Sequence, residues 1–219
     1  MHNVTVAFAA LLVMLLSYFF GCFNGSFMVS HFIIRDDVRK HGSGNAGLTN
    51  FYRTYGAKYA LLVIACDMGK TVAACLLGSF FFRCLGWDGT LGTLLAGLGC
   101  ELGHIFPVFY GFRGGKGILS GGTLVLLLNW RVAAVAWALF LLLWLTTRYV
   151  SLASITATCS APITVYFVYG HNWLYTGLCL AVAALVVWCH RENIQRLLHG
   201  TEKKFKWHVN PTEGKDPPK

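Results

Sequence analysis

Apolar residues follow one another in seven long stretches of this chain, and shorter polar segments separate these stretches. A helix needs roughly 20 predominantly apolar residues to cross the hydrocarbon core of a bilayer, and most of the stretches approach that length. The pattern therefore predicts an all-α, polytopic integral membrane protein with about seven transmembrane helices. The predicted segments are Val4–Phe23, Ala57–Phe82, Leu91–Phe109, Ile118–Asn129, Val132–Leu145, Val150–Phe167 and Trp173–Cys189.

The fourth segment, Ile118–Asn129, is the shortest. As an α-helix it would rise only about 18 Å, whereas the hydrocarbon core is about 30 Å thick. We expect this helix to tilt, to stop halfway across, or to borrow residues from the glycine-rich loop before it.

After the seventh segment the chain has an amphipathic stretch and then a charged, proline-containing tail. Ile194, Leu197 and Leu198 leave an apolar stripe beside charged residues, which is typical of a helix that lies in the membrane interface. Residues 209–219 combine prolines with mixed charge. We therefore expect residues 1–208 to form a single membrane-embedded domain and residues 209–219 to form a disordered cytoplasmic tail.

Lysine and arginine gather in alternate loops, and this decides the predicted orientation. The loops after the first, third, fifth and seventh segments hold most of them, while the intervening loops hold only Arg83 and Arg131. By the positive-inside rule the N-terminus lies outside and the C-terminus lies in the cytoplasm. Topology and anionic substrates or head groups then explain the net charge of +9, and since no nucleic-acid motif is present we expect no nucleic-acid partner.

Composition narrows the class further. Hydrophobic residues make up 56% of the chain and charged residues 12%, which excludes an ordinary soluble domain. The eight cysteines lie almost entirely inside apolar segments, without a CxxC pair and without a histidine at zinc-ligand spacing. We expect no metal, no cofactor and no disulfide framework.

The loop between the first two segments reads GSGNAGLTNFYR from Gly42 to Arg53. Its glycines permit positive φ, so that successive backbone N–H groups can converge on an anion, and Arg53 can add a bidentate contact to a phosphate. The small polar residues fit such a site better than a plain flexible loop. The candidate phosphate ligands here are Ser43, Asn45, Thr49, Asn50 and Arg53.

A second loop, GFRGGKG, precedes the fourth segment. Glycines expose its backbone, two cations flank them, and a helix begins at its end, which together favour a second phosphate site over a tight interfacial turn. It is not a Walker A loop, because glycine stands where serine or threonine is required. The candidate ligands are Arg113, Gly114, Gly115, Lys116 and Gly117.

Ionisable residues also occur inside the apolar segments. Asp67 and Lys70 share one helix face, as do Glu101 and His104. Such residues suggest a functional site by default, although for Asp67 and Lys70 a structural ion pair is an equally good interpretation.

Two further clusters lie in predicted cytoplasmic loops. Arg148 and Ser151 can reach the same surface, with Arg148 as a topology anchor as the alternative. His31 and Asp36 have the H-x4-D spacing of one class of glycerolipid acyltransferases, but the chain lacks that class's Phe-Pro-Glu-Gly motif.

Three stretches of the sequence, GSGNAGLTNFYR, GHIFPVFYGFRGGKG and HRENIQRLLHGTEKK, resemble the signature stretches of the bacterial acyl-phosphate-dependent glycerol-3-phosphate acyltransferases, the PlsY family. CDMGKT and TRYVSLASI fall where that family has an Asp-x-x-Lys and a Tyr-x-Ser-Leu element. The resemblance runs from about Tyr18 to Lys204. It departs from the family at Gly21-Cys22-Phe23-Asn24, at Thr71 and at Glu101.

The resemblance implies a seven-helix enzyme of the bacterial cytoplasmic (inner) membrane with its active site on the cytoplasmic side. Members transfer a fatty acyl group from acyl phosphate to the sn-1 hydroxyl of glycerol 3-phosphate, giving lysophosphatidate and inorganic phosphate. The implied partners are these two substrates, membrane lipid and the enzyme that makes the acyl phosphate. The matching residues outside the first loop are His104, Lys116 with its glycines, His190, Asn193 and Glu202.

We expect direct attack by the glycerol hydroxyl, because no Ser-His-Asp set is visible; the proton goes to a substrate phosphate oxygen, to His190 or to His104. Two other functions stay open. One is an acyl-CoA-dependent acyltransferase that uses His31 and Asp36. The other is an organic-anion transporter, although transporters usually contain repeats around a site at the midplane and no repeat is visible here.

Overall fold

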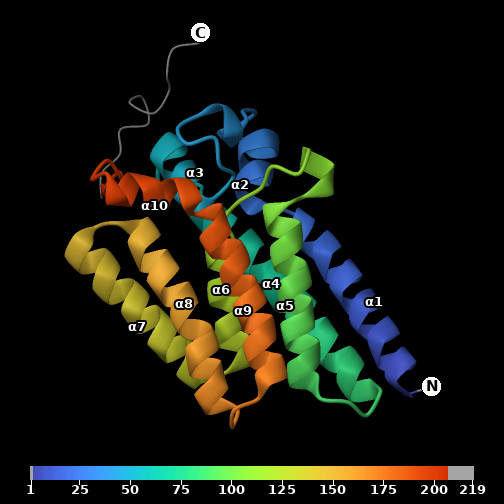
Figure 1. Ribbon diagram of the computed structural model, residues 1–219. Helices are drawn as coiled ribbons and strands as arrows, with labels where there is room; N and C mark the ends of the chain where they lie inside the picture. The colour runs from blue at the N-terminus through green and yellow to red at the C-terminus, as the bar shows by residue number, and fades with distance from the viewer. Residues whose placement is uncertain (1, 207–219) are drawn as a thin grey trace.

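The computed structural model describes residues 2–206, and every regular element within this range is a helix. The predicted tail at residues 209–219 lies outside the described residues. Figure 1 shows the long helices side by side in one bundle, with short helices gathered over one end of it. The all-α prediction is confirmed.

Each predicted apolar segment corresponds to one long helix. Within the described range the seven helices are α1 (His2–Cys22), α4 (Ala60–Cys84), α5 (Gly89–Ile105), α6 (Ile118–Leu128), α7 (Trp130–Thr147), α8 (Val150–Val168) and α9 (Trp173–Cys189). The predicted third segment was too long at its C-terminal end, because Phe106 already leaves the helix and Pro107 follows it.

Length and apolar composition qualify five helical stretches as membrane spans, or six if the bent pair α9 and α10 (Arg191–Leu198) counts as one. α6 has 11 residues and falls short. Seven full crossings, and the orientation of the termini, therefore stay predictions.

The polar segment between α1 and α4 contains structure that hydrophobic patterning missed. It forms α2 (Gly25–Met28), a π-helical turn η1 (Val29–Ile33), a 3₁₀ turn η2 (Val38–Lys40) and α3 (Leu48–Tyr55). A further 3₁₀ turn, η3 (Val108–Tyr110), follows α5. α10 bends by 59° from α9, and Figure 1 shows it lying across the end of the bundle, as expected of the apolar stripe at Ile194–Leu198.

Glycines bring α1 and α5 into backbone contact. A Cβ atom added at Gly103 would lie 2.9 Å from the Cα of Gly21, and one added at Gly99 would lie 2.4 Å from the carbonyl oxygen of Met14. Real Cβ atoms almost never approach so closely, so these positions require glycine. The close approach fixes the end of α1 against the end of α5 that carries His104.

We expect Gly103→Ala to destabilise the bundle by about 1–3 kcal/mol, because the added methyl group overpacks the contact between α1 and α5. Gly69→Ala in α4 is the matched control, since a Cβ there meets nothing within 4 Å and alanine favours a helix over glycine by about 1 kcal/mol. Thermal unfolding in detergent measures both variants. Equal loss of stability would contradict the packing assigned to Gly103.

Candidate active site

A cavity of about 620 Å³ lies under the short helices, between the ends of α4, α5, α8 and α9. Its lining changes from polar to apolar from Lys116, just before α6, to Val125 on α6, and from His190, at the end of α9, back to Cys179. Such a cavity accommodates a ligand with a polar head and a long apolar tail. Polar residues at its mouth are Ser43, Asn45, Thr49, Asn50, Arg53, His104, Lys116, Ser151, Ser154, His190, Asn193, Arg196 and Glu202.

Aromatic side chains form one wall of this cavity. Trp137, Phe140 and Trp144 recur at helical spacing along α7, with ring centroids 5.9 Å and 6.0 Å apart in succession. At the mouth Phe205 packs 5.3 Å from Trp144 and 5.3 Å from Tyr52 of α3. The wall thus continues from the polar mouth into the apolar depth.

The first glycine loop has the backbone that its sequence predicts, with positive φ at Gly42 (58°) and Gly44 (70°). Asn50 fixes this loop. Its Nδ2 donates to the carbonyl oxygens of Val38, His41 and Asn45 at 3.0–3.1 Å, and its Oδ1 accepts from the N–H of Ser43 at 3.0 Å. Asn50 therefore acts on the loop backbone, although we expected it to bind phosphate directly.

The two glycine loops are hydrogen-bonded to each other. The N–H of Ala46 donates to the carbonyl oxygen of Gly114 at 3.2 Å, and Asn45 Nδ2 donates to the same oxygen at 3.3 Å. Gly114 does not line the cavity, and neither does Arg113, whose side chain is exposed. Gly115 does not line the cavity either, so these three predicted ligands are not brought to the site, whereas Ser43 and Thr49 are.

Gly115 and Gly117 place the second loop against α5. The N–H of Gly115 donates to the His104 carbonyl oxygen at 3.1 Å, and a Cβ at Gly115 would overlap the His104 ring. Gly117 has φ 79° and immediately precedes α6 as its N-cap. Lys116 between them lines the cavity and donates from Nζ to Asn193 Oδ1.

Glu202 gathers the polar groups on the opposite side of the mouth. Its Oε1 accepts from Ser151 Oγ at 2.8 Å and from Asn193 Nδ2 at 2.7 Å, and its Oε2 accepts from Arg196 Nε at 2.7 Å. Partial burial opposes ionisation, but these hydrogen bonds outweigh it and hold the pKa of the Glu202 carboxyl below its ordinary value. A carboxylate repels phosphate, so Glu202 positions its donors and does not bind the anion itself.

Arg196 is a cavity residue that our sequence analysis missed. It follows Asn193 by three residues on α10, so both face the same side of that helix. The three-residue spacing from Asn193 was the sequence feature that could have identified Arg196 as a site residue. Arg53 faces it from α3 and donates from Nη2 to the carbonyl oxygen of Lys203 at 3.1 Å.

His190 is buried in the cavity wall, and its hydrogen bond fixes its tautomer. Nδ1 lies 2.8 Å from the carbonyl oxygen of Val186. A carbonyl oxygen only accepts, so Nδ1 carries the proton and the neutral ring keeps a lone pair on Nε2. His190 can therefore take up a proton at Nε2.

His104 has the opposite tautomer. Its Nδ1 lies 2.8 Å from Lys70 Nζ and 3.5 Å from Asp67 Oδ1, and only the Lys70 contact has hydrogen-bond geometry. An ammonium group only donates, so the ring proton resides on Nε2. Lys70 Nζ also forms an ion pair with Asp67 Oδ1 at 2.8 Å and does not line the cavity. The structural ion pair is thus what the geometry shows for Lys70, and His104 presents a donor to the cavity.

Neither of the two remaining clusters is assembled as a unit. Ser151 lies at the cavity mouth without Arg148. Arg148 is exposed, adopts φ 62° at the end of α7 and lies outside the cavity lining. Asp36 Oδ2 pairs with His41 Nε2 at 2.8 Å, while the exposed His31 stacks on Phe27 with centroids 5.2 Å apart. No hydrogen bond joins His31 to Asp36 in the described part of the chain.

Among residues 2–206, no three His, Cys, Asp or Glu side chains lie close enough together to hold a metal ion.

The sequence profile of the family described as Glycerol-3-phosphate acyltransferase matches residues 11–200. A glycerol-3-phosphate acyltransferase of Syntrophomonas wolfei is 40% identical over 197 residues, covering 90% of this chain and 96% of the relative. One of Finegoldia magna is 38% identical over 189 residues, covering 86% and 92% respectively.

A solved structure agrees with these relatives. The crystal structure of PlsY (YgiH), an integral membrane glycerol 3-phosphate acyltransferase, in its glycerol 3-phosphate form superposes with a TM-score of 0.79 at 37% identity. The alignment covers 90% of this chain and 96% of that one. A lysophosphatidic acid form of PlsY gives a TM-score of 0.77 at 35% identity. The protein is thus a member of the glycerol-3-phosphate acyltransferase family of the PlsY type.

Proposed function

We propose that this protein transfers a fatty acyl group from acyl phosphate to the sn-1 hydroxyl of glycerol 3-phosphate, at the cytoplasmic face of a bacterial inner membrane. The products are lysophosphatidate and inorganic phosphate. The observation that carries the proposal is the cavity, whose mouth is cationic and hydrogen-bonding and whose depth is apolar. Family membership and the glycerol 3-phosphate and lysophosphatidic acid forms of the similar PlsY structures support it.

Three cations at the mouth suit the phosphates of the two substrates. Lys116, Arg53 and Arg196 line the cavity, and Ser43 and Thr49 add hydroxyl groups. Lysine binds phosphate as a point charge, whereas arginine presents a planar fork of donors. The apolar depth beside α6 and α7 accommodates the fatty chain of the donor.

The histidines divide the chemistry between them. The sn-1 oxygen forms a bond to the acyl carbon, the bond from that carbon to the bridging phosphate oxygen breaks, and its electron pair leaves with phosphate. His190 Nε2 accepts the hydroxyl proton and returns it to the departing phosphate. His104 Nε2–H donates to a phosphate oxygen. Acyl phosphate is an activated anhydride, so positioning and charge stabilisation supply most of the acceleration.

The donor distinguishes this proposal from the acyl-CoA alternative. We expect purified protein to form lysophosphatidate from glycerol 3-phosphate and palmitoyl phosphate, with release of inorganic phosphate, and to form none from palmitoyl-CoA. Product from the CoA ester alone would exclude acyl phosphate as the donor. Product from neither, together with uptake of glycerol 3-phosphate into sealed vesicles, would favour a transporter.

Because the two histidines carry their ring protons on different nitrogens, we expect substitutions of His104 and His190 to change the kinetics in different ways. His104→Gln keeps an N–H donor near the Nε2 position, whereas His104→Asn does not, so we expect a clearly larger loss of kcat/KM in His104→Asn. His190→Ala removes the proton acceptor, and we expect kcat to fall by about 10²–10⁴-fold. Initial rates with palmitoyl phosphate measure all three. An unchanged kcat in His190→Ala would assign the proton to a substrate oxygen instead.

Lys116 predicts a dependence of binding on pH. Burial lowers the pKa of Lys116 below the ordinary value of lysine, the nearby Arg196 lowers it further, and Glu202 opposes both. Only the ammonium form attracts phosphate, so binding is strongest below this pKa and is lost as pH rises through it. We expect KM for glycerol 3-phosphate to rise on the alkaline side below pH 10.5.

Lys116→Arg is the matched variant for this measurement, because a guanidinium keeps its charge throughout that range. We expect the alkaline rise in KM to disappear or to move to higher pH in this variant. The same alkaline rise in both proteins would assign it to another group.

A further inference from the structure

We infer that the end of the bundle opposite the cavity mouth binds the phosphate group of a membrane phospholipid. A second cavity of about 180 Å³ lies there, where the C-terminal half of α4 meets the start of α5 and the end of α6. One ordered water needs only about 15 Å³ of such space, so this cavity has room for a larger group. Its lining residues are Cys75, Leu76, Ser79, Arg83, Thr90, Thr93, Leu127 and Leu128.

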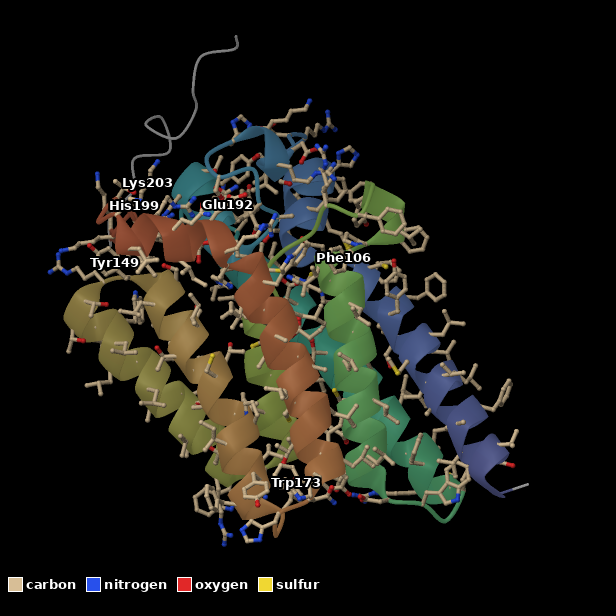
Figure 2. The ribbon with its side chains drawn as sticks, in the orientation of Figure 1. Phe106, Tyr149, Trp173, Glu192, His199 and Lys203 are labelled. Carbon is tan, nitrogen blue, oxygen red and sulfur yellow. The ribbon has the colours of Figure 1, made fainter. Side chains whose placement is uncertain are left out.

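This cavity is separate from the candidate active site. On α4 the first cavity is lined by Ala60, Ile64, Asp67 and Met68, and the second begins two turns later at Cys75. On α5 His104 faces the first cavity, whereas Thr90 and Thr93 in the first turns face the second. Figure 2 marks this end of the bundle by Trp173, at the start of α9.

Hydrogen-bond donors converge on this cavity without protein partners. Arg83 is exposed, and Ser79 and Thr90 are half-buried. The guanidinium of Arg83 and the hydroxyls of Ser79 and Thr90 have no hydrogen bond or ion pair within residues 2–206, whereas Thr93 Oγ1 donates to the Gly89 carbonyl oxygen at 3.1 Å. A Cβ added at Gly89 would lie 2.7 Å from Ser79 Oγ and would also overlap Arg83, so these two side chains meet over Gly89.

The carboxylate that precedes Thr90 in the sequence, Asp88, caps the start of α5. Asp88 precedes α5 and accepts from the N–H of Thr90 at 2.8 Å, and the described residues contain no ion pair between Asp88 and Arg83. A cation beside the hydrocarbon region is stabilised by an opposite charge. A phosphate offers only acceptors and one or more negative charges, so it complements Arg83, Ser79 and Thr90 together.

The surroundings favour a lipid over free phosphate as the source of that group. Leu76 lines the cavity and is 57% exposed. Leu77 and Phe80 continue this apolar surface along α4, at 54% and 66% exposure. A phosphodiester bound at Arg83 can therefore lay its acyl chains along α4, whereas inorganic phosphate gains nothing from that surface.

Lipid titration of two variants tests the site. Native mass spectrometry of the full chain in detergent would count bound dioleoylphosphatidylglycerol, with diolein as a phosphate-free control. We expect Arg83→Gln to weaken the tightest phosphatidylglycerol binding at least tenfold and diolein to show no such binding. Arg131→Gln is the matched control, because Arg131 lies at the same end but stacks on Trp130, 5.6 Å from its ring centroid, and we expect it to bind like the unchanged protein.

Equal phosphatidylglycerol binding by the two variants would overturn the proposal and leave Arg83 as an anchor of α4 only. A second series with inorganic phosphate distinguishes the two sources. Thermal stabilisation by millimolar phosphate that depends on Arg83, without preference for the lipid, would show a free-anion site and overturn the lipid assignment. Ser79→Ala and Thr90→Ala each remove one donor at little risk to folding, and we expect each to weaken lipid binding several-fold.

Discussion

The ion pair between Lys70 and Asp67 is the interaction on which the arrangement of the site depends. Both side chains are almost fully buried, with Nζ and Oδ1 2.8 Å apart. Removing one partner of such a pair typically costs about 3–5 kcal/mol, because the other charge stays buried alone. The pair therefore holds together whatever it contacts.

Its contacts join three parts of the molecule. Lys70 Nζ donates to the carbonyl oxygens of Gly21 and Phe23 at 3.1 Å, where α1 ends, and Asp67 accepts from the N–H of Gly25 at 3.0 Å, where α2 begins. The same ammonium orients the His104 ring. The buried ammonium of Lys70 thus fixes the break between α1 and α2, and the first glycine loop follows from that break. It also fixes the orientation of His104, the hydrogen-bond donor beside the second glycine loop.

Sequence patterning predicted the long helices well because burial in lipid requires continuous apolar surface, and that requirement is visible residue by residue. It missed α2 and α3, whose polar residues satisfy backbone groups and pack on only one face. The residue types indicated a phosphate site, but they did not distinguish the residues that contact phosphate from those that hold the loops in place. The polar atoms of Asn50 and Glu202 form hydrogen bonds to neighbouring protein groups. Only the three-dimensional structure shows which polar atoms are left to bind a substrate.

The shortness of α6 has a consequence for where charge resides in the membrane. The chain doubles back after α5, so that Gly115 lies against His104 and Gly117 lies against the side chain of Glu101, a turn deeper along α5. α6 rises only about 16 Å from there, and the second glycine loop therefore lies below the ends of its neighbouring helices. In that position fewer water molecules screen Lys116, and its field reaches further. The phosphate of a substrate can therefore stay beside the cation while the fatty acyl chain stays among the apolar side chains, and the two groups still lie next to each other.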